Sequence, residues 1–325
     1  MSWRWRSIAV LSILLSMLLL ACRSAVGANA GPTAASSATP VPSSRAAGPS
    51  TPSTAGTQPT PILRTDSAKE IILSTTTSTQ NSGLLDVLLP RFEQQTGYRV
   101  KPEAVGSGAA IALGERGEAD VVLVHAPASE RPFVASGAGI DRQLVMYNDF
   151  VLVGPPDDPA GIRDITDAVA ALKQIAAKGS PFISRGDNSG TQQLRLQLWK
   201  DAVMTPSGES WYVESGTGMG QTLQVADQRR AYTLSDRGTY LAFKDRVKLD
   251  ILVEKDERLL NVYHVIAMNP QRFPAVNAAG AQAFINFLLA PETQQFIGDF
   301  GRDRYNQPLF VSCAQNHCGL KDPKD

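Results

Sequence analysis

Residues 70–92 have the sequence EIILSTTTSTQNSGLLDVLLPRF, and this stretch decides the fold class. The run Glu70–Leu73, mostly apolar, predicts a short buried strand. Six hydroxyl residues, 74–79, follow, and apolar residues then recur at helical spacing from Leu84 to Phe92. A strand, a hydroxyl-rich turn and a helix in this order indicate an α/β protein.

The same alternation continues along the chain. Short apolar runs at Ala119–Val124, Phe150–Val153 and Val262–Asn269 are separated by helical patterns. The run at Phe150–Val153 predicts a short strand that ends at Gly154. Regular alternation of strands and helices favours an α/β fold with a largely parallel sheet.

Composition excludes several functional classes. The 325 residues carry no formal net charge, so nothing indicates a nucleic-acid partner. Three cysteines and three histidines are too few for an obvious zinc site or a serine–histidine hydrolase. We therefore expect a binding protein with no cofactor and no bound metal cation, rather than an enzyme.

The N-terminus predicts export. Arg4 and Arg6 precede the apolar run Ile8–Leu20, which is too short for an ordinary transmembrane helix. The sequence Leu-Leu-Ala-Cys at 19–22 resembles a bacterial lipobox, so residues 1–22 are interpreted as a lipoprotein signal peptide and Cys22 as the lipidated residue. The alternative is a plain signal peptide with a cysteine at this position by chance.

Residues 23–65 consist almost entirely of Ala, Ser, Thr, Pro and Gly. Such a segment buries too little apolar surface to fold, so we interpret it as a disordered tether. The sequence therefore predicts an extracytoplasmic monomer, lipid-anchored to the bacterial membrane at the cell surface or in the periplasm. Contact with the membrane is expected through the anchor only.

Cys313 and Cys318 lie close together near the C-terminus. In an oxidising compartment this spacing favours a local disulfide. Free thiols, or a metal site that also uses His317, are the alternatives.

Hydroxyl and glycine residues are concentrated where predicted strands turn into helices. The free N–H groups and the dipole of a helix start favour an anion there, although Ser and Thr also serve as simple N-caps. Six hydroxyl residues in one turn exceed what capping needs. The further turns of this kind are Val105–Gly108, Ser184–Thr191 and Glu214–Gly220.

The turn at Ser184–Thr191 adds a cation. Arg185 offers a rigid fork of donors that suits an oxyanion, and Ser189 and Thr191 add donors at a helix start. Asp187 could hold the Arg185 guanidinium in place. A surface turn with a local ion pair is the alternative. Together, these turns could surround a small anion in one cleft.

Several motifs, taken in order, resemble the tungstate-binding proteins of the Tup-type ABC importers, which belong to the periplasmic substrate-binding proteins. The likeness covers about residues 69–308. It is carried by residues 75–85, 124–127, 146–150, 184–191 and 233–239.

This resemblance implies a two-lobe periplasmic-binding-protein fold of type II, with the ligand cleft between the lobes. Residues 66–148 plus 262–325 would form the first lobe and residues 149–261 the second. The implied partners are tungstate, or molybdate, and an ABC permease with its ATPase. The implied oxyanion-binding residues are Thr76, Thr77, Ser78, Ser107, Arg185, Ser189, Thr191, Ser215, Gly216 and Thr217.

The segment Arg185–Thr191 also resembles the signature of phosphate-binding proteins, so a phosphate receptor is the alternative. Phosphate carries a proton near neutral pH and benefits from a carboxylate acceptor, whereas a carboxylate facing tungstate would repel it. For a tungstate receptor we therefore expect Asp187 to contact Arg185 and backbone amides.

Overall fold

The computed structural model describes residues 69–314 and 318–320, all of which lie in the second of two units of the chain, 61–325. The predicted signal peptide, Cys22 and the tether 23–65 lie outside the described residues. So does His317, which the alternative metal site would use.

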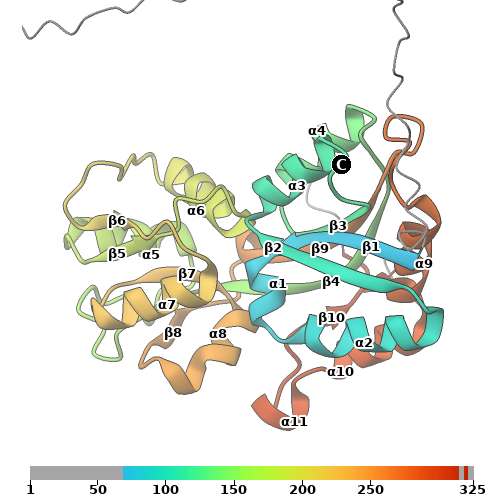
Figure 1. Ribbon diagram of the computed structural model, residues 1–325. Helices are drawn as coiled ribbons and strands as arrows, with labels where there is room; N and C mark the ends of the chain where they lie inside the picture. Colours follow the sequence, from blue (N-terminus) through green and yellow to red (C-terminus); the bar gives the residue numbers. More distant parts are fainter. Residues whose placement is uncertain (1–68, 315–317, 321–325) are drawn as a thin grey trace, which may run out of the picture. The chain divides into compact units, whose positions relative to one another are not determined.

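The first lobe is built around a mixed sheet of strand order β10-β4-β9-β3-β1-β2 (Figure 1). β1 pairs in parallel with β2 and β3, whereas the pairs β3–β9, β4–β9 and β4–β10 are antiparallel. The strands are β1 (Glu70–Thr76), β2 (Arg99–Val105), β3 (Val121–Val124), β4 (Gly139–Gly154), β9 (Leu260–Met268) and β10 (Val311–Ser312).

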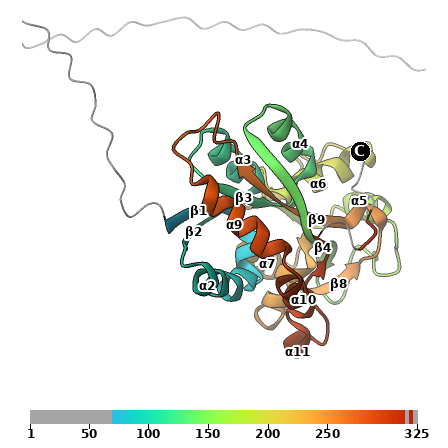
Figure 2. The ribbon, with the colours of Figure 1, turned by 90° about the vertical axis from the view of Figure 1, so that its right-hand side faces the viewer.

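Helices cover both faces of this sheet, as the end-on view in Figure 2 shows. Leu73, Leu88 and Phe284 belong to the core on one face, and Val122 and Phe133 to the core on the other. The helices are α1 (Thr77–Asn81), α2 (Leu84–Thr96), α3 (Ser107–Glu115), α4 (Pro127–Ala135), α9 (Ala278–Leu289), α10 (Pro291–Asp299) and α11 (Arg302–Tyr305).

The second lobe has its own core, which includes Leu172, Phe182, Trp199 and Tyr232. Its strands are β5 (Phe182–Ser184), β6 (Tyr212–Glu214), β7 (Thr233–Asp236) and β8 (Asp250–Val253). β5 and β6 pair in parallel, and β7 and β8 pair with the end of β4. Its helices are α5 (Ala168–Ala177), α6 (Gly190–Asp201), α7 (Met219–Gln228) and α8 (Arg237–Phe243), with the 3-10 turns η2 (Lys244–Arg246) and η3 (Glu257–Leu259).

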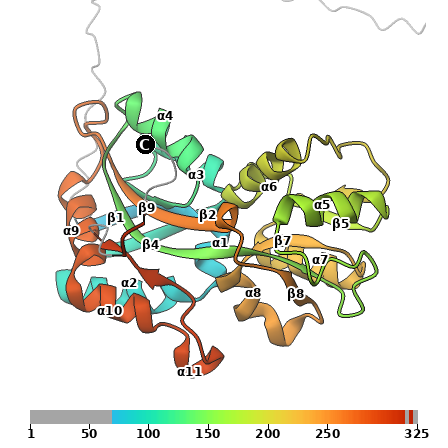
Figure 3. The same cartoon turned by 180° about the vertical axis from the view of Figure 1, so that it is seen from behind.

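β4 passes between the lobes, which Figure 3 shows from behind. Its pairing with β9 ends at Asp149, and its pairing with β7 begins at Phe150. Beside this point Asn261 Nδ2 donates to Asn148 Oδ1 at 2.7 Å. The lobe limits expected from the sequence stay predictions, but the strand changes partner close to them.

Two expectations about the strands were wrong. Phe150–Val153 is the end of the 16-residue strand β4, because residues 139–149 pair with β9 although they include polar and charged side chains. The sheet of the first lobe is mixed rather than largely parallel, since β4 and β9, which link the lobes, both run antiparallel to their neighbours.

Near the C-terminus, Cys313 and Cys318 form a disulfide with their Cα atoms 5.0 Å apart. Cys313 N–H also donates to Val145 O at 3.0 Å, which attaches this segment to β4. Over residues 69–314 and 318–320, no helix has both the length and the apolar character that a membrane span needs.

Candidate functional site

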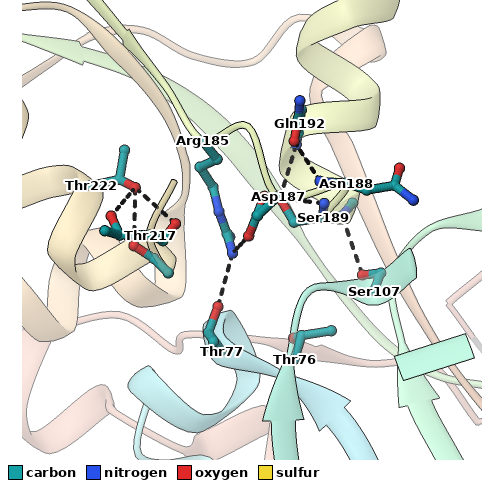
Figure 4. A network of polar contacts seen from close by, with 12 residues as sticks. Thr76, Thr77, Ser107, Arg185, Asp187, Asn188, Ser189, Gln192, Thr217 and Thr222 are labelled. Atoms are coloured by element: carbon teal, nitrogen blue, oxygen red, sulfur yellow. Dashed lines mark hydrogen bonds and ion pairs between the residues drawn. The ribbon is translucent and has the colours of Figure 1, made fainter. Parts of the chain in front are cut away.

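Four helices begin where the two lobes face each other, and each is the next element after a strand (Figure 4). Their N-cap residues are small or carry hydroxyls. The unpaired N–H groups at such helix ends, together with the helix dipoles, make them suitable for an anion. The N-caps are Thr76 for α1, Gly106 for α3, Ser189 for α6 and Gly218 for α7.

Arg185 lies between the lobes and has only 1% of its surface exposed. Its Nη2 contacts the Asp187 carboxylate and donates to Thr77 Oγ1, at the start of α1, at 3.0 Å. Burial lowers the pKa of Arg185, and the neighbouring Asp187 opposes this effect. Arg185 Nε is buried without a hydrogen-bond partner, so one donor of the fork remains available to a ligand.

Asp187 makes the two kinds of contact expected from the sequence. Its Oδ2 pairs with Arg185, and its Oδ1 accepts from Ser189 N–H at 3.2 Å. The carboxylate therefore orients the guanidinium and the start of α6.

Backbone groups also join the two lobes at the site. Gly190 N–H donates to Ser107 Oγ at 3.3 Å, and Gly108 N–H donates to Asn188 O at 3.1 Å. The close approach of α3 to the turn at Asn188 requires glycine at position 108, because a Cβ there would lie 2.2 Å from Asn188 Nδ2 and 2.9 Å from Asn188 O.

The hydroxyls of the first turn divide into two kinds. Thr76 Oγ1 caps α1, accepting from Thr79 N–H at 3.1 Å and bonding Thr79 Oγ1 at 2.8 Å. Ser78 Oγ is buried without a partner, and so is Thr191 Oγ1 at the start of α6. Such groups are costly unless a ligand or water satisfies them, so these two hydroxyls are candidate ligand contacts.

The turn at Ser215–Thr217 supports Arg185 rather than presenting free hydroxyls. Gly216 N–H donates to Arg185 O at 2.7 Å. Ser215 Oγ bonds Thr222 Oγ1 at 2.9 Å and accepts from Thr217 Oγ1 at 3.1 Å. The hydroxyls in this turn are thus engaged with one another.

Sequence reasoning missed Thr222 and Asn188, which complete these contacts. Thr222 lies inside α7, one turn after its N-cap, and the helical spacing was its only signal. Asn188 has a positive φ of 52°, which Asn tolerates better than most residues, within a turn already rich in glycine.

Neighbouring side chains hold His125 beside the anion site. His125 Nδ1 is 2.9 Å from Asn261 Oδ1, its ring stacks on Tyr263, and burial lowers its pKa. Within residues 69–314 and 318–320, no group of three His, Cys, Asp or Glu side chains is placed to hold a metal ion. The arrangement offers the cation Arg185, helix N-termini and hydroxyl donors, a set that suits an anion.

Comparisons with known proteins agree with this geometry. Residues 37–292 match the PBP superfamily domain. The chain is 50% identical to the tungstate-binding protein TupA of Peptoclostridium acidaminophilum over 255 residues, which cover 78% of this chain and 89% of that protein.

Two solved structures are also similar. The tungstate ABC transporter from Geobacter sulfurreducens is 51% identical with a TM-score of 0.66, over 71% of this chain and 99% of that one. The tungstate-binding protein TupA from Desulfovibrio alaskensis G20 is 44% identical with a TM-score of 0.64, over 75% and 99%. The chain therefore belongs to the PBP superfamily, in the same family as the TupA proteins.

Proposed function

We propose that this chain is the substrate-binding protein of an ABC importer and captures tungstate between its lobes. One observation carries the proposal: buried donors without partners lie where helices of the two lobes begin. These are Arg185 Nε, Ser78 Oγ and Thr191 Oγ1. A tetrahedral oxyanion would satisfy these donors, and relatives at 50% and 51% identity are named for tungstate. The chain is a solute-binding protein and not an enzyme.

The contacts of Asp187 favour tungstate over phosphate. A protonated phosphate needs an acceptor directed at it, whereas Asp187 is directed at Arg185 through Oδ2 and at Ser189 N–H through Oδ1. The choice between tungstate and molybdate rests on the relatives, because the two anions are nearly the same in size and charge.

The test is thermal unfolding of residues 66–325 with tungstate, molybdate, sulfate and phosphate, followed by calorimetry. A ligand at 100 times its Kd stabilises the folded state by about 2.7 kcal/mol. For a chain of this size that raises the Tm by roughly 5–10 °C. We expect this shift with tungstate and little with phosphate or sulfate, and a shift with phosphate alone would contradict the proposal.

Delivery to the permease of an ABC importer takes place outside the cytoplasm. We propose that a lipid on Cys22 holds the protein at the membrane and that residues 23–65 act as its tether. Cys22→Ser should move the full chain from the membrane fraction to the soluble one. Continued fractionation of the variant with membranes would contradict the anchor.

We also propose that the protein acts as a monomer. Light scattering of residues 66–325, with and without tungstate, should give the mass of one chain in both states. A ligand-dependent dimer would contradict this part of the proposal.

A further inference from the structure

A second arginine of the second lobe is buried behind the anion site. Arg195 lies on α6, one turn after Thr191, and is 0% exposed. Its Nε donates to Ser184 Oγ at 3.1 Å, while Nη1 and Nη2 are buried without hydrogen-bond partners. Among residues 69–314 and 318–320, no carboxylate forms an ion pair with Arg195.

An unpaired buried cation is costly, so its surroundings must compensate it. Tyr212 lies close to Arg195 and opposes the effect of burial on its pKa, but it offers a hydroxyl group and not a paired carboxylate. Burial lowers the pKa of Arg195 to about 10, which leaves it protonated at pH 7. The positive charge is therefore present when the protein works.

Helix geometry directs the Arg195 side chain toward the start of α6. Side chains on a helix lean toward its N-terminus, and the N-terminus of α6 is where Ser189 and Thr191 lie. Ser184, which accepts from Arg195, directly precedes Arg185 in the chain. Arg195 also lies within electrostatic range of both Arg185 and Asp187.

The charges at the site show why a second cation matters. Arg185 and Asp187 form an ion pair with no net charge. Asp236 adds a buried carboxylate within range of Arg185, and one of its oxygens has no partner. Without Arg195, the two carboxylates would outnumber the cation Arg185, and the remaining stabilisation of a dianion would come from helix N-termini and neutral donors.

We propose that Arg195 sets the charge selectivity of the site: without touching the oxyanion, it favours a tetrahedral dianion over a monoanion of the same shape. This inference rests on the proposed function and extends it. Because the energy between charges scales with their product, loss of Arg195 should weaken binding of a dianion about twice as much, in free energy, as binding of a monoanion.

The experiment compares tungstate with perrhenate, a tetrahedral monoanion of similar size, by calorimetry at pH 7.5 and fixed ionic strength. Arg195→Met removes the charge and keeps an apolar stem, and Arg195→Lys keeps the charge. We expect Arg195→Met to lower the ratio of tungstate to perrhenate affinity by about tenfold. Arg195→Lys should keep this ratio within threefold of the parent. Arg230→Met, at an exposed arginine of the same lobe, is the matched control.

A folded Arg195→Met protein that keeps the parent ratio within threefold would overturn the inference, because a purely structural role weakens both anions alike. Replacing a buried charge by an apolar residue is often tolerated. If this variant fails to fold, Arg195→Gln, which keeps a donor for Ser184, gives the same comparison with the same criterion. Absence of tungstate binding by the unmodified protein would instead refute the proposed function, and the inference with it.

Discussion

The two lobes contribute different chemistry to the cleft. The first lobe supplies neutral donors, namely the hydroxyls of Thr77, Ser78 and Ser107 with the starts of α1 and α3. The second lobe supplies the cation Arg185 and the carboxylate that orients it. The comparison suggests a division of tasks in which the second lobe provides most of the affinity and the first lobe provides shape and closure. Changes in each lobe test that division.

The largest effect is expected from the second lobe. Arg185→Ala removes a buried charge-assisted donor and leaves Asp187 without its partner, which costs about 2–5 kcal/mol of binding free energy. Calorimetric titration with tungstate measures the loss, and Arg230→Ala, at an exposed ion pair, is the control. A Kd within threefold of the parent would remove Arg185 from the ligand set.

The next largest effect on tungstate affinity is expected from the contact between the lobes. In Gly108→Ala the new Cβ would meet the backbone oxygen of Asn188 at 2.9 Å, so the lobes could not approach as closely. Overpacking of this kind costs about 1–3 kcal/mol, which corresponds to roughly 5- to 150-fold weaker binding. Small-angle scattering with saturating tungstate should also give a larger radius of gyration than for the parent.

The matched control is Gly298→Ala in α10, where the atom nearest to a new Cβ would be Ser312 Oγ at 3.2 Å. If Gly108→Ala binds and compacts like this control, the approach of α3 to the turn at Asn188 is not needed for closure.

A smaller effect is expected from a single hydroxyl of the first lobe. Thr77→Val keeps the shape of the side chain but removes the acceptor for Arg185 Nη2. The loss of one hydrogen bond costs about 1 kcal/mol, or roughly fivefold in affinity. Thr205→Val, at an exposed position of the second lobe, is the control. A loss as large as that of Arg185→Ala would show that the lobes contribute equally.

The disulfide should not affect binding at all. Replacing Cys313 and Cys318 by Ser opens a short loop, which the chain-entropy relation values at about 2 kcal/mol of folding stability. A decrease in Tm of roughly 4–8 °C with unchanged tungstate affinity is expected from paired scanning calorimetry and titration. A weaker tungstate affinity of this variant would show that the disulfide segment influences the anion site through β4.

Local patterns predicted much of the fold and of the site. The hydroxyl turn after β1 and the Arg185 turn before α6 were both visible, because capping and turn chemistry depend on neighbouring residues. The length of β4 was not visible, since its polar residues belong to a strand only through pairing with β9. Arg195 was missed for a similar reason: within a helix an arginine is typical of an exposed face, and only tertiary packing buries it.

The burial of Arg185, Ser78 and Thr191 also limits what a receiving permease can detect. These side chains are covered while the lobes are together, so a docking partner cannot inspect the cargo or the groups that hold it. Such a partner can sense only the outer surfaces of the lobes and their mutual position. Discrimination between oxyanions must therefore be complete before docking. The transporter can detect only whether the lobes are closed, and not which anion they hold.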